Sequence, residues 1–286
     1  MAMALDRLLQ KLQSQVPSLV SLALAVCGWL VAVAGLLPWW KAGTGHMLGL
    51  TCSIALFLTS FYRAVTTNPG AGAEWNSSVL RNGTDSHAPR AHCIICNADK
   101  FERVSHCRQC DRCVLRMDHH CGWIRNCVGY NNHKMFLTLV LWQCVASAHY
   151  LTIWGYTIHG CMHRKVGVGL WDVPRPNDGW LMWGGLLAMV AAADVLLTMS
   201  LLVFHITIIG HNVTTLECFY PSKKDESGGP GEAARLHAPP EGWSLVAKWR
   251  WLRAALHGRT WRFGNYTAVL GTDWWCWLLP THPRRK

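Results

Sequence analysis

A short stretch of the chain holds an unusual density of thiol and imidazole side chains. Seven of the 13 cysteines fall between Cys93 and Cys127, interleaved with His106, His119 and His120. Thiolate and imidazole are the ligands that Zn²⁺ prefers in closed tetrahedral sites. The CxxC pairs in this stretch favour metal sites over disulfides. Two sites of about four ligands each would leave at least one thiol and one imidazole over.

The groups left over could do chemistry. Asp118, His119 and Cys121 form a short acid–imidazole–thiol series. An imidazolium lowers the pKa of a neighbouring thiol and creates a thiolate nucleophile, and a carboxylate on the far ring nitrogen fixes the tautomer. The alternative is that all these residues are ligands, or partners of ligands, in an inert zinc module. Counting ligands leaves both interpretations open.

The rest of the chain must hold this segment at a membrane. Of the 286 residues, 51% are apolar and 15% are charged, whereas soluble domains have about 25% charged residues. This composition excludes a disordered chain and argues against a single soluble globule. We predict an α-helical polytopic membrane protein whose first helix is not a cleaved signal peptide. Its four transmembrane helices would form from the apolar runs at 17–37, 46–62, 135–160 and 180–210.

The distribution of basic residues predicts the orientation of the chain. With four spans, both termini and the Cys-rich loop share one side, which carries 23 Lys and Arg residues against four on the other. The positive-inside rule places that side in the cytosol. The glycosylation sequons at Asn76, Asn82, Asn212 and Asn265 are then chance matches. The predicted divisions are a cytosolic N-terminus at 1–16, two transmembrane helices within 17–63, a cytosolic loop at 64–134 with its zinc domain at 91–134, a third helix at 135–160, a lumenal loop at 161–179, a fourth helix at 180–210 and a cytosolic tail at 211–286.

The tail and the fourth span hold further candidate features. Residues 243–257 predict a basic amphipathic helix that lies on the membrane or packs against the Cys-rich loop. Trp274, Trp275 and Trp277 predict an interfacial anchor. No internal repeat of useful period is evident in the chain.

Two ionisable residues of the fourth span are expected to have structural roles. A charge deep in a bilayer needs a partner, and we expect Asp194 to contact a polar group on another helix, such as His149. His205, near the cytosolic end of the span, is expected to serve in packing. Cys218, just beyond it, is expected to be an ordinary thiol rather than an acylated one.

The Cys-rich segment resembles that of the DHHC-type protein S-acyltransferases, the membrane palmitoyltransferases. The match in spacing runs from Cys93 through Asp118-His119-His120-Cys121 to Cys127, Asn132 and Phe136, and the four spans and the tail agree with it. Flanking motifs are also similar to those of the family. They are Asn68-Pro69-Gly70 for its Asp-Pro-Gly, Thr214-Thr215-Leu216-Glu217 for its Thr-Thr-x-Glu, and Asn265-Tyr266 for its aromatic-Asn motif. The departures at Asn68, Phe101 and Gly122 remove no expected ligand or catalytic group.

The resemblance implies a role for each of these residues. One Zn²⁺ would be held by Cys93, Cys96, His106 and Cys113, and a second by Cys107, Cys110, His120 and Cys127. Cys121 would be the nucleophile, His119 its base and Asp118 the group that orients the base. Thr215 would stand near Asp118, and Asn265 would brace the tail.

The resemblance also implies a reaction and its partners. Cys121 would take a fatty acyl group, typically palmitoyl, from acyl-CoA and pass it to cysteine thiols of substrate proteins at the cytosolic membrane face. A cavity among the helices would receive the acyl chain. The expected partners are the lipid bilayer, acyl-CoA and substrate proteins, with no nucleic acid, and the expected location is an endomembrane such as the endoplasmic reticulum or Golgi. Lys100, Arg103, Arg108 and Arg112 would help to bind the CoA phosphates.

Three other functions compete with this reaction. A non-catalytic, membrane-anchored zinc module that binds a partner protein is the main alternative. A membrane ubiquitin ligase is disfavoured because no further CxxC pair comes after Cys127. A metal transporter is disfavoured because the spans lack the several ionisable residues that an ion path requires.

Overall fold

A computed structural model describes residues 23, 30, 43–71, 91–101, 103–162, 178–219 and 261–284. The predicted first span and the predicted amphipathic helix fall almost entirely outside these residues. The chain divides into two compact units. The first comprises residues 1–63, 122–125 and 137–202, and the second comprises residues 64–121, 126–136 and 203–286.

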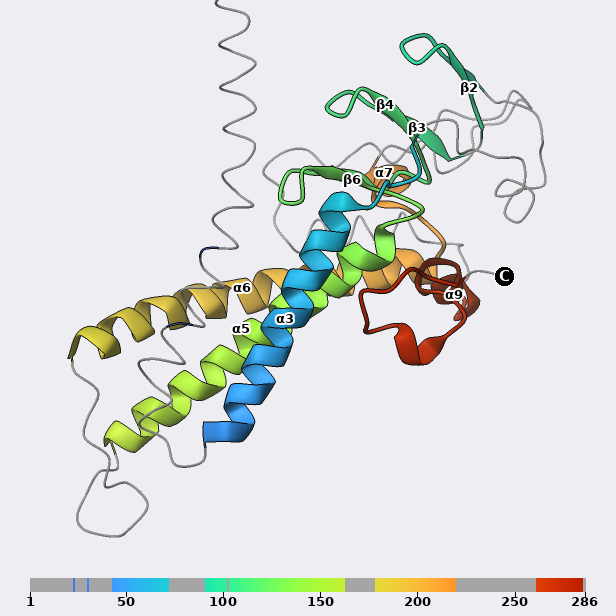
Figure 1. Ribbon diagram of the computed structural model, residues 1–286. Coiled ribbons are helices and arrows are strands. Elements are labelled where there is room, and N and C mark those ends of the chain that lie inside the picture. The colour runs from blue at the N-terminus through green and yellow to red at the C-terminus, as the bar shows by residue number, and fades with distance from the viewer. Residues whose placement is uncertain are drawn as a thin grey trace, which may run out of the picture. The chain divides into compact units, whose positions relative to one another are not determined.

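Three long helices dominate the described chain (Figure 1). They are α3 (Gly43–Thr66), α5 (His133–Met162) and α6 (Asp178–Gly210). Among the described residues, their segments Leu48–Thr66, His133–Met162 and Gly179–Gly210 are long and apolar enough to cross a membrane. Large apolar side chains also point outward from them, as at Leu196, which is 74% exposed. Such faces suit a hydrocarbon surrounding, and the chain is a membrane protein.

Small residues let the three helices pack closely in the first unit. Leu50 of α3, Tyr150 and Ile153 of α5 and Ala188 of α6 share one buried cluster. A Cβ atom at Gly184 would clash with the ring of Trp154, so α6 needs a glycine where α5 presents an indole. Close contact through small residues is the usual way in which membrane helices associate.

Asp194 of α6 contacts α5 through two polar side chains. Its Oδ2 accepts hydrogen bonds from Gln143 Nε2 at 3.0 Å and from Ser147 Oγ at 2.7 Å. The expected helix–helix contact is therefore present, but the suggested partner His149 is wrong. The ring of His149 lies instead edge-on to His46, with 5.7 Å between the ring centroids.

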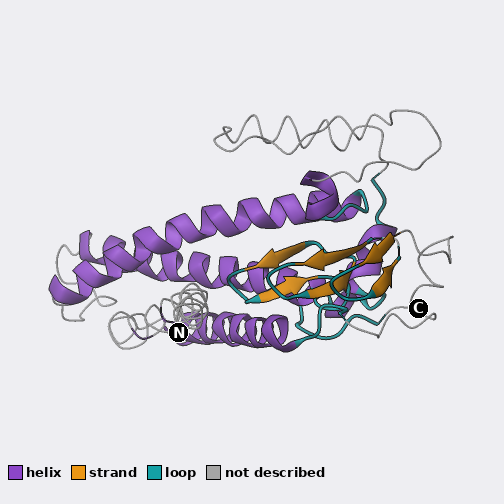
Figure 2. Cartoon of the chain, turned by 90° about the horizontal axis from the view of Figure 1, so that it is seen from above, coloured by secondary structure: helices purple, strands orange, loops and turns teal. Residues whose placement is uncertain are grey.

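The strands of the second unit pair as three antiparallel hairpins, and they are drawn in orange in Figure 2. Each is a separate two-stranded sheet. The pairs are β1 (Ala91–Cys93) with β2 (Ala98–Lys100), β3 (Val104–Cys107) with β4 (Arg112–Leu115), and β5 (His119–Cys121) with β6 (Asn126–Val128).

The hairpins repeat one pattern along the chain. A His-Cys pair ends the first strand of each hairpin and recurs every 14 residues, at positions 92, 106 and 120. A four-residue turn comes next, and its last residue has a positive φ: 47° at Asn97, 50° at Asp111 and 49° at Arg125. The prediction that the chain holds no useful repeat is therefore wrong. The repeat is short and its other positions vary, so composition does not reveal it.

Asparagine side chains fix the third hairpin and the segment before it. Asn126 Nδ2 donates to the carbonyl oxygens of Ala64, Val65 and Thr67, at 3.2, 3.2 and 3.0 Å, where α3 ends. Asn68 Oδ1 accepts hydrogen bonds from the backbone N–H groups of Gly70 and Ala71, at 3.0 and 2.7 Å. An aspartate at this position would accept the same bonds, so the Asn68 departure preserves the turn.

The described part of the tail packs against the end of α6 within the second unit. It forms α7 (Thr215–Phe219), α9 (Gly264–Leu270) and the 3₁₀ turn η4 (Trp274–Cys276). Asn265 Nδ2 donates to the Gly210 carbonyl at 2.7 Å, and Tyr266 Oη donates to the Ile206 carbonyl at 2.8 Å. The Gly210 carbonyl is one of those that the end of α6 leaves without an intrahelical partner.

Candidate active site

Two groups of four side chains in the hairpins could each hold a metal ion. Within each group, every pair of ligand atoms lies within 4.8 Å. In the first group, His106 Nδ1 lies 3.3 to 3.8 Å from three sulfur atoms. In the second, His120 Nδ1 has the same range of distances to its three sulfur atoms. The groups are Cys93, Cys96, His106 and Cys113, and Cys107, Cys110, His120 and Cys127.

The spacing and chemistry of both groups fit a tetrahedral metal ion. Bond lengths of about 2.3 Å to sulfur and about 2.1 Å to nitrogen place those two atoms about 3.6 Å apart in a tetrahedron. Burial and the neighbouring thiols Cys93 and Cys96 raise the pKa of Cys113 to about 12. A thiol that resists ionisation in this way can become thiolate when a cation compensates the charge.

The repeat explains how the two groups are built. Each group takes the CxxC pair of one hairpin and the cross-strand His and Cys of the next hairpin. The first hairpin comes after no CxxC pair of this series, and its equivalent cross-strand residues, His92 and Asp99, pair with each other at 3.0 Å. Three hairpins therefore create two junctions and two metal groups.

The third hairpin has a different role for its cysteine. Cys121 occupies the place of Cys93 and Cys107 at the end of a first strand, but Ile124 stands where those hairpins have their second cysteine. After β6 the described chain leads into α5 rather than into another hairpin. Cys121 is thus a member of neither metal group.

Cys121 is next to an Asp–His pair instead. His119 forms a hydrogen bond with the Cys121 side chain, and its Nδ1 lies 2.8 Å from Asp118 Oδ2. Successive residues of a strand point to opposite faces, which explains why His119 meets Asp118 while His120 joins a metal group. The structure brings together the acid, imidazole and thiol of the predicted catalytic series.

The electrostatics of the pair favour an imidazolium. Burial lowers the pKa of His119, but the hydrogen bonds and charges of Asp118 and Cys121 outweigh it and raise this pKa to about 9. Asp118 is fully buried, which by itself raises its pKa, yet His119 and the nearby His133 and His205 hold it far below the usual range. At neutral pH the arrangement is therefore a carboxylate, an imidazolium and a thiol that can ionise beside it.

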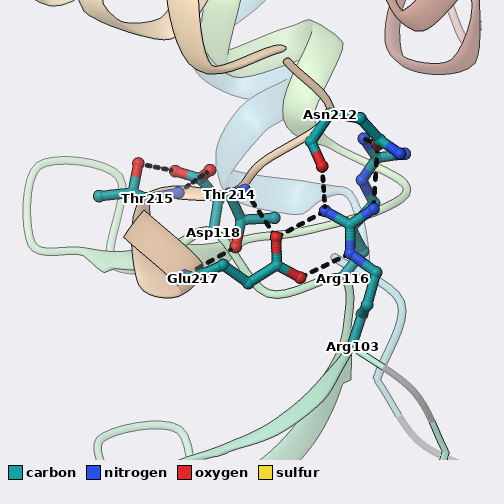
Figure 3. A network of polar contacts seen from close by, with 7 residues as sticks. All are labelled: Arg103, Arg116, Asp118, Asn212, Thr214, Thr215 and Glu217. Atoms are coloured by element: carbon teal, nitrogen blue, oxygen red, sulfur yellow. Dashed lines mark hydrogen bonds and ion pairs between the residues drawn. The ribbon is translucent and has the colours of Figure 1, made fainter. Parts of the chain in front are cut away.

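Thr215, which is 97 residues away in the sequence, holds the buried carboxylate of Asp118 (Figure 3). Its backbone N–H donates to Asp118 Oδ1 at 2.8 Å, and its hydroxyl donates to Oδ2 at 2.7 Å. The Leu216 N–H donates to the Asp118 carbonyl at 3.0 Å. The predicted proximity of Thr215 to Asp118 is thus a direct, two-point contact that anchors α7 to the site.

Arg103 supports the same helix. Its guanidinium donates to both carboxylate oxygens of Glu217, at 2.6 and 2.8 Å, and to Asn212 Oδ1 at 3.0 Å (Figure 3). Glu217 also accepts from the Thr214 N–H at 2.9 Å. A bidentate arginine–carboxylate pair is among the strongest polar contacts. The guanidinium predicted to bind CoA phosphates is therefore already paired with Glu217 of α7.

The other three predicted CoA-binding cations differ in their surroundings. Arg112 Nη2 donates to Asn126 Oδ1 at 3.0 Å, within the hairpin series. Lys100 ends β2, and Arg108 lies exposed in the turn between β3 and β4. Arg103 and Arg112 already donate hydrogen bonds to other side chains. Among the described residues, no such bond is seen for Lys100 or Arg108, which therefore stay candidates for phosphate binding.

Sequence reasoning did not predict the contacts that two ring side chains, His205 and Phe136, make with His119. His205, predicted to serve in packing, has its ring centroid 5.9 Å from that of His119, and Phe136 of α5 lies 5.1 Å from the His119 ring. His133 lies 5.6 Å from His205. The family resemblance includes Phe136 but implies no role for it. For His205 the only signal was a histidine near the end of an apolar helix, and the spacing of the sequence does not indicate what that helix end contacts.

Comparisons with known proteins agree with this geometry. Residues 86–220 match the family model described as DHHC palmitoyltransferase. The chain is 32% identical to "Probable protein S-acyltransferase 15" of Arabidopsis thaliana over 83% of each chain. It is 28% identical to "Palmitoyltransferase PFA3" of Eremothecium gossypii, over 79% of this chain and 70% of the relative. It is 31% identical to "Palmitoyltransferase ZDHHC7" of Mus musculus, over 49% of this chain and 50% of the relative.

Proposed function

Since the chain belongs to the DHHC palmitoyltransferase family, we propose that Cys121 carries the acyl group during its reaction. The protein is an acyltransferase that transfers palmitoyl groups to protein cysteines. The observation that supports Cys121 as the acyl carrier is its hydrogen bond to the His119–Asp118 pair, outside both metal groups.

The first step forms the acyl-enzyme. The Cys121 thiolate attacks the thioester carbon of a fatty acyl-CoA, the bond from that carbon to the CoA sulfur breaks, and the departing CoA thiolate takes the proton of the His119 imidazolium. Asp118 keeps this imidazole in one tautomer and orientation. One thioester replaces another, so catalysis consists mainly of activating and positioning the thiol.

The second step returns the enzyme to its starting state. Neutral His119 takes the proton of a substrate cysteine, and the resulting thiolate attacks the acyl carbon. The bond to Cys121 breaks, which restores the Cys121 thiolate beside the His119 imidazolium. The acyl group leaves on the substrate protein.

The ions that fit the two Cys/His groups are zinc in this proposal. Their donor sets of three sulfurs and one nitrogen suit a closed structural site. The ions would supply cross-links between successive hairpins and no reactive group. Without the ions, His120 of β5 would no longer be cross-linked to the second hairpin. The strand could then not hold the neighbouring His119 in place beside Asp118.

The membrane arrangement in the proposal is based on the charge distribution and the helices. Residues 17–37 would add a first span to α3, α5 and α6, and the hairpins would lie on the cytosolic face of an endomembrane. The acyl chain would enter the apolar helices, where burial contributes about 0.8 kcal/mol per CH₂. Lys100, which is half-buried, and Arg108, which is exposed, would contact the CoA phosphates.

The test is acyl labelling of the purified full-length protein in detergent micelles. Incubation with radiolabelled palmitoyl-CoA should give a protein-bound label that neutral hydroxylamine removes, as expected for a thioester. Cys121→Ser should carry no such label, whereas Cys276→Ser, a cysteine in neither metal group, should keep it. A label that persists in Cys121→Ser would contradict the proposal.

A further inference from the structure

His205 is a buried imidazole that the reaction described above does not use. It lies on α6 and is 1% exposed. The rings of Phe136 and Phe204 lie 5.1 and 5.4 Å from it, at steep angles. Its neighbours are thus mostly rings, which would pack equally well against an apolar side chain of this size.

One atom of His205 argues against a role in packing alone. Its Nδ1 is buried and has no hydrogen-bond partner among the described residues. A buried nitrogen without a partner destabilises the folded state, so an imidazole at this place needs a compensating benefit. Asp118 Oδ2, an acceptor, lies 3.9 Å from this nitrogen.

Asp118 Oδ2 is also the atom that holds His119. It accepts one hydrogen bond from His119 Nδ1 at 2.8 Å and one from the Thr215 hydroxyl at 2.7 Å. In the reaction, His119 alternates between imidazolium and neutral imidazole, so its attraction to this oxygen is stronger in the first state and weaker in the second. A shift of about 1 Å would bring His205 Nδ1 within hydrogen-bond distance, where it could hold the carboxylate while His119 is neutral.

We propose that His205 is a positioning residue of the transfer reaction, whose Nδ1–H steadies the Asp118 carboxylate so that Asp118 keeps His119 directed at Cys121. The inference rests on the proposed function of Cys121. It assigns to α6 a second hold on the carboxylate, in addition to the bonds from α7.

Metal binding is the alternative explanation for the cluster of Asp118, His119 and His205. These residues lie close enough together to bind a metal ion. However, both oxygens of Asp118 already accept hydrogen bonds from Thr215, and the separation of 2.8 Å between Asp118 and His119 is that of a hydrogen bond. The proposal therefore requires that replacement of His205 leave the metal content unchanged.

Two substitutions separate a donor role from a packing role. The side-chain nitrogen of His205→Asn is as many bonds from the backbone as Nδ1 and can donate in its place, although the ring is lost. His205→Phe keeps the ring and removes the donor. We expect the rate of acyl-enzyme formation to fall about 10- to 100-fold in His205→Phe and less than about 3-fold in His205→Asn, because one buried hydrogen bond to a charged group contributes about 1.5 to 3 kcal/mol.

The measurement is the pre-steady-state rate of acyl-enzyme formation with palmitoyl-CoA in excess, monitored by the hydroxylamine-sensitive label. The rate at which iodoacetamide alkylates the Cys121 peptide provides a second readout that needs no acyl-CoA. Both rates should rank wild type, then Asn, then Phe. The reverse order, with Phe near wild type and Asn impaired, would show that His205 only packs.

Metal analysis and Cys121→Ser make the outcomes distinguishable. Zinc content should be the same in wild type and both His205 variants, which also shows that the hairpins are folded. Loss of one zinc in either variant would overturn the proposal in favour of a metal site. If Cys121→Ser loses the acyl label while His205→Phe reacts like wild type, only the inference about His205 fails. A label that survives in Cys121→Ser would instead defeat the proposed function.

Discussion

The second and third hairpins share a four-residue turn but use the cysteine before it differently. Cys107 and Cys121 each end a first strand, and each precedes a four-residue turn that closes with a positive φ. Cys107 lies 3.5 Å from His120 of the third hairpin and belongs to a metal group. Cys121 belongs to none and meets His119 of its own strand.

The difference between the two hairpins teaches that the next element of the chain decides the role of a hairpin's cysteine. A CxxC pair is a half-site, and the cross-strand His and Cys of the next hairpin complete it. The third hairpin lacks the second cysteine, because Ile124 replaces it, and α5 takes the place of a next hairpin. The geometry that presents a thiolate to a metal can thus present a nucleophile where the series ends.

The same substitution at the two equivalent cysteines should have the largest effects and should distinguish the two hairpins by their zinc content. Cys107→Ser removes a metal ligand, and loss of a structural site of this kind unfolds small metal domains. We expect it to reduce zinc content below two ions per chain and to abolish acylation. Cys121→Ser should also abolish acylation but keep both ions. Zinc analysis of the purified variants measures this, and loss of zinc from Cys121→Ser would place Cys121 in a metal group.

Asp118→Asn should isolate the part that electrostatics play in the third hairpin. Loss of the carboxylate should reduce the acylation rate about 10²- to 10⁴-fold, as for the orienting acid of other triads. Because the folded pKa of His119 is raised to about 9, its ion pair stabilises the fold fully below about pH 6.5 and loses this contribution as pH rises through 9.

The pH dependence gives a second readout of the same variant. The wild-type acylation rate should fall above about pH 9, where His119 loses the proton that CoA requires as it leaves. In Asp118→Asn this fall should begin at lower pH, because the carboxylate no longer raises the pKa of His119. An unchanged alkaline limb would contradict the assignment of the limb to His119.

Ile124→Cys should make the third hairpin resemble the second more closely. The substitution restores the CxxC spacing but not the ligands of a further hairpin. We expect zinc content to stay at that of wild type, and acylation to become sensitive to mild oxidants because the two thiols can form a disulfide. Activity should return with a reductant, and Ile124→Val should show no such sensitivity. A third zinc per chain would show that the half-site alone captures a metal.

Substitutions of Arg103 and Arg108 should have smaller effects, one on the maximal rate and the other on KM. Arg103→Ala removes the bidentate contact with Glu217, so we expect the maximal rate to fall about 3- to 10-fold, in the range of a partly exposed charged hydrogen bond. The KM for palmitoyl-CoA should change little. Arg108→Ala should instead raise that KM by a similar factor. A raised KM in Arg103→Ala would indicate that this arginine contacts CoA.

The local parts of the site could be predicted from sequence. Counting ligands already indicates that at least one thiol and one imidazole are left over from two metal sites. The apolar runs likewise predict α3, α5 and α6, since length and hydropathy are local properties. The repeat at positions 92, 106 and 120 was also present in the sequence and was missed.

The long-range parts could not be predicted in the same way. His205 meets Asp118, and Arg103 meets Glu217, across more than 80 residues of chain. Nothing in the spacing near Arg103 distinguishes a positioning cation from a phosphate-binding one. The partner of Asp194 depends on the rotation of α5 and α6 about their axes, which the nearly uniform apolar sequence of α6 does not specify.

Alkylation of the seven cysteines between Cys93 and Cys127 in the native, zinc-loaded protein tests the central claim most directly. Mass spectrometry of the resulting peptides reports each thiol separately. We predict that iodoacetamide modifies Cys121 rapidly while the six thiols of the metal groups are protected, and that all seven react after chelation and unfolding. Protection of Cys121 by bound zinc, with another of the seven reacting in its place, would contradict the account.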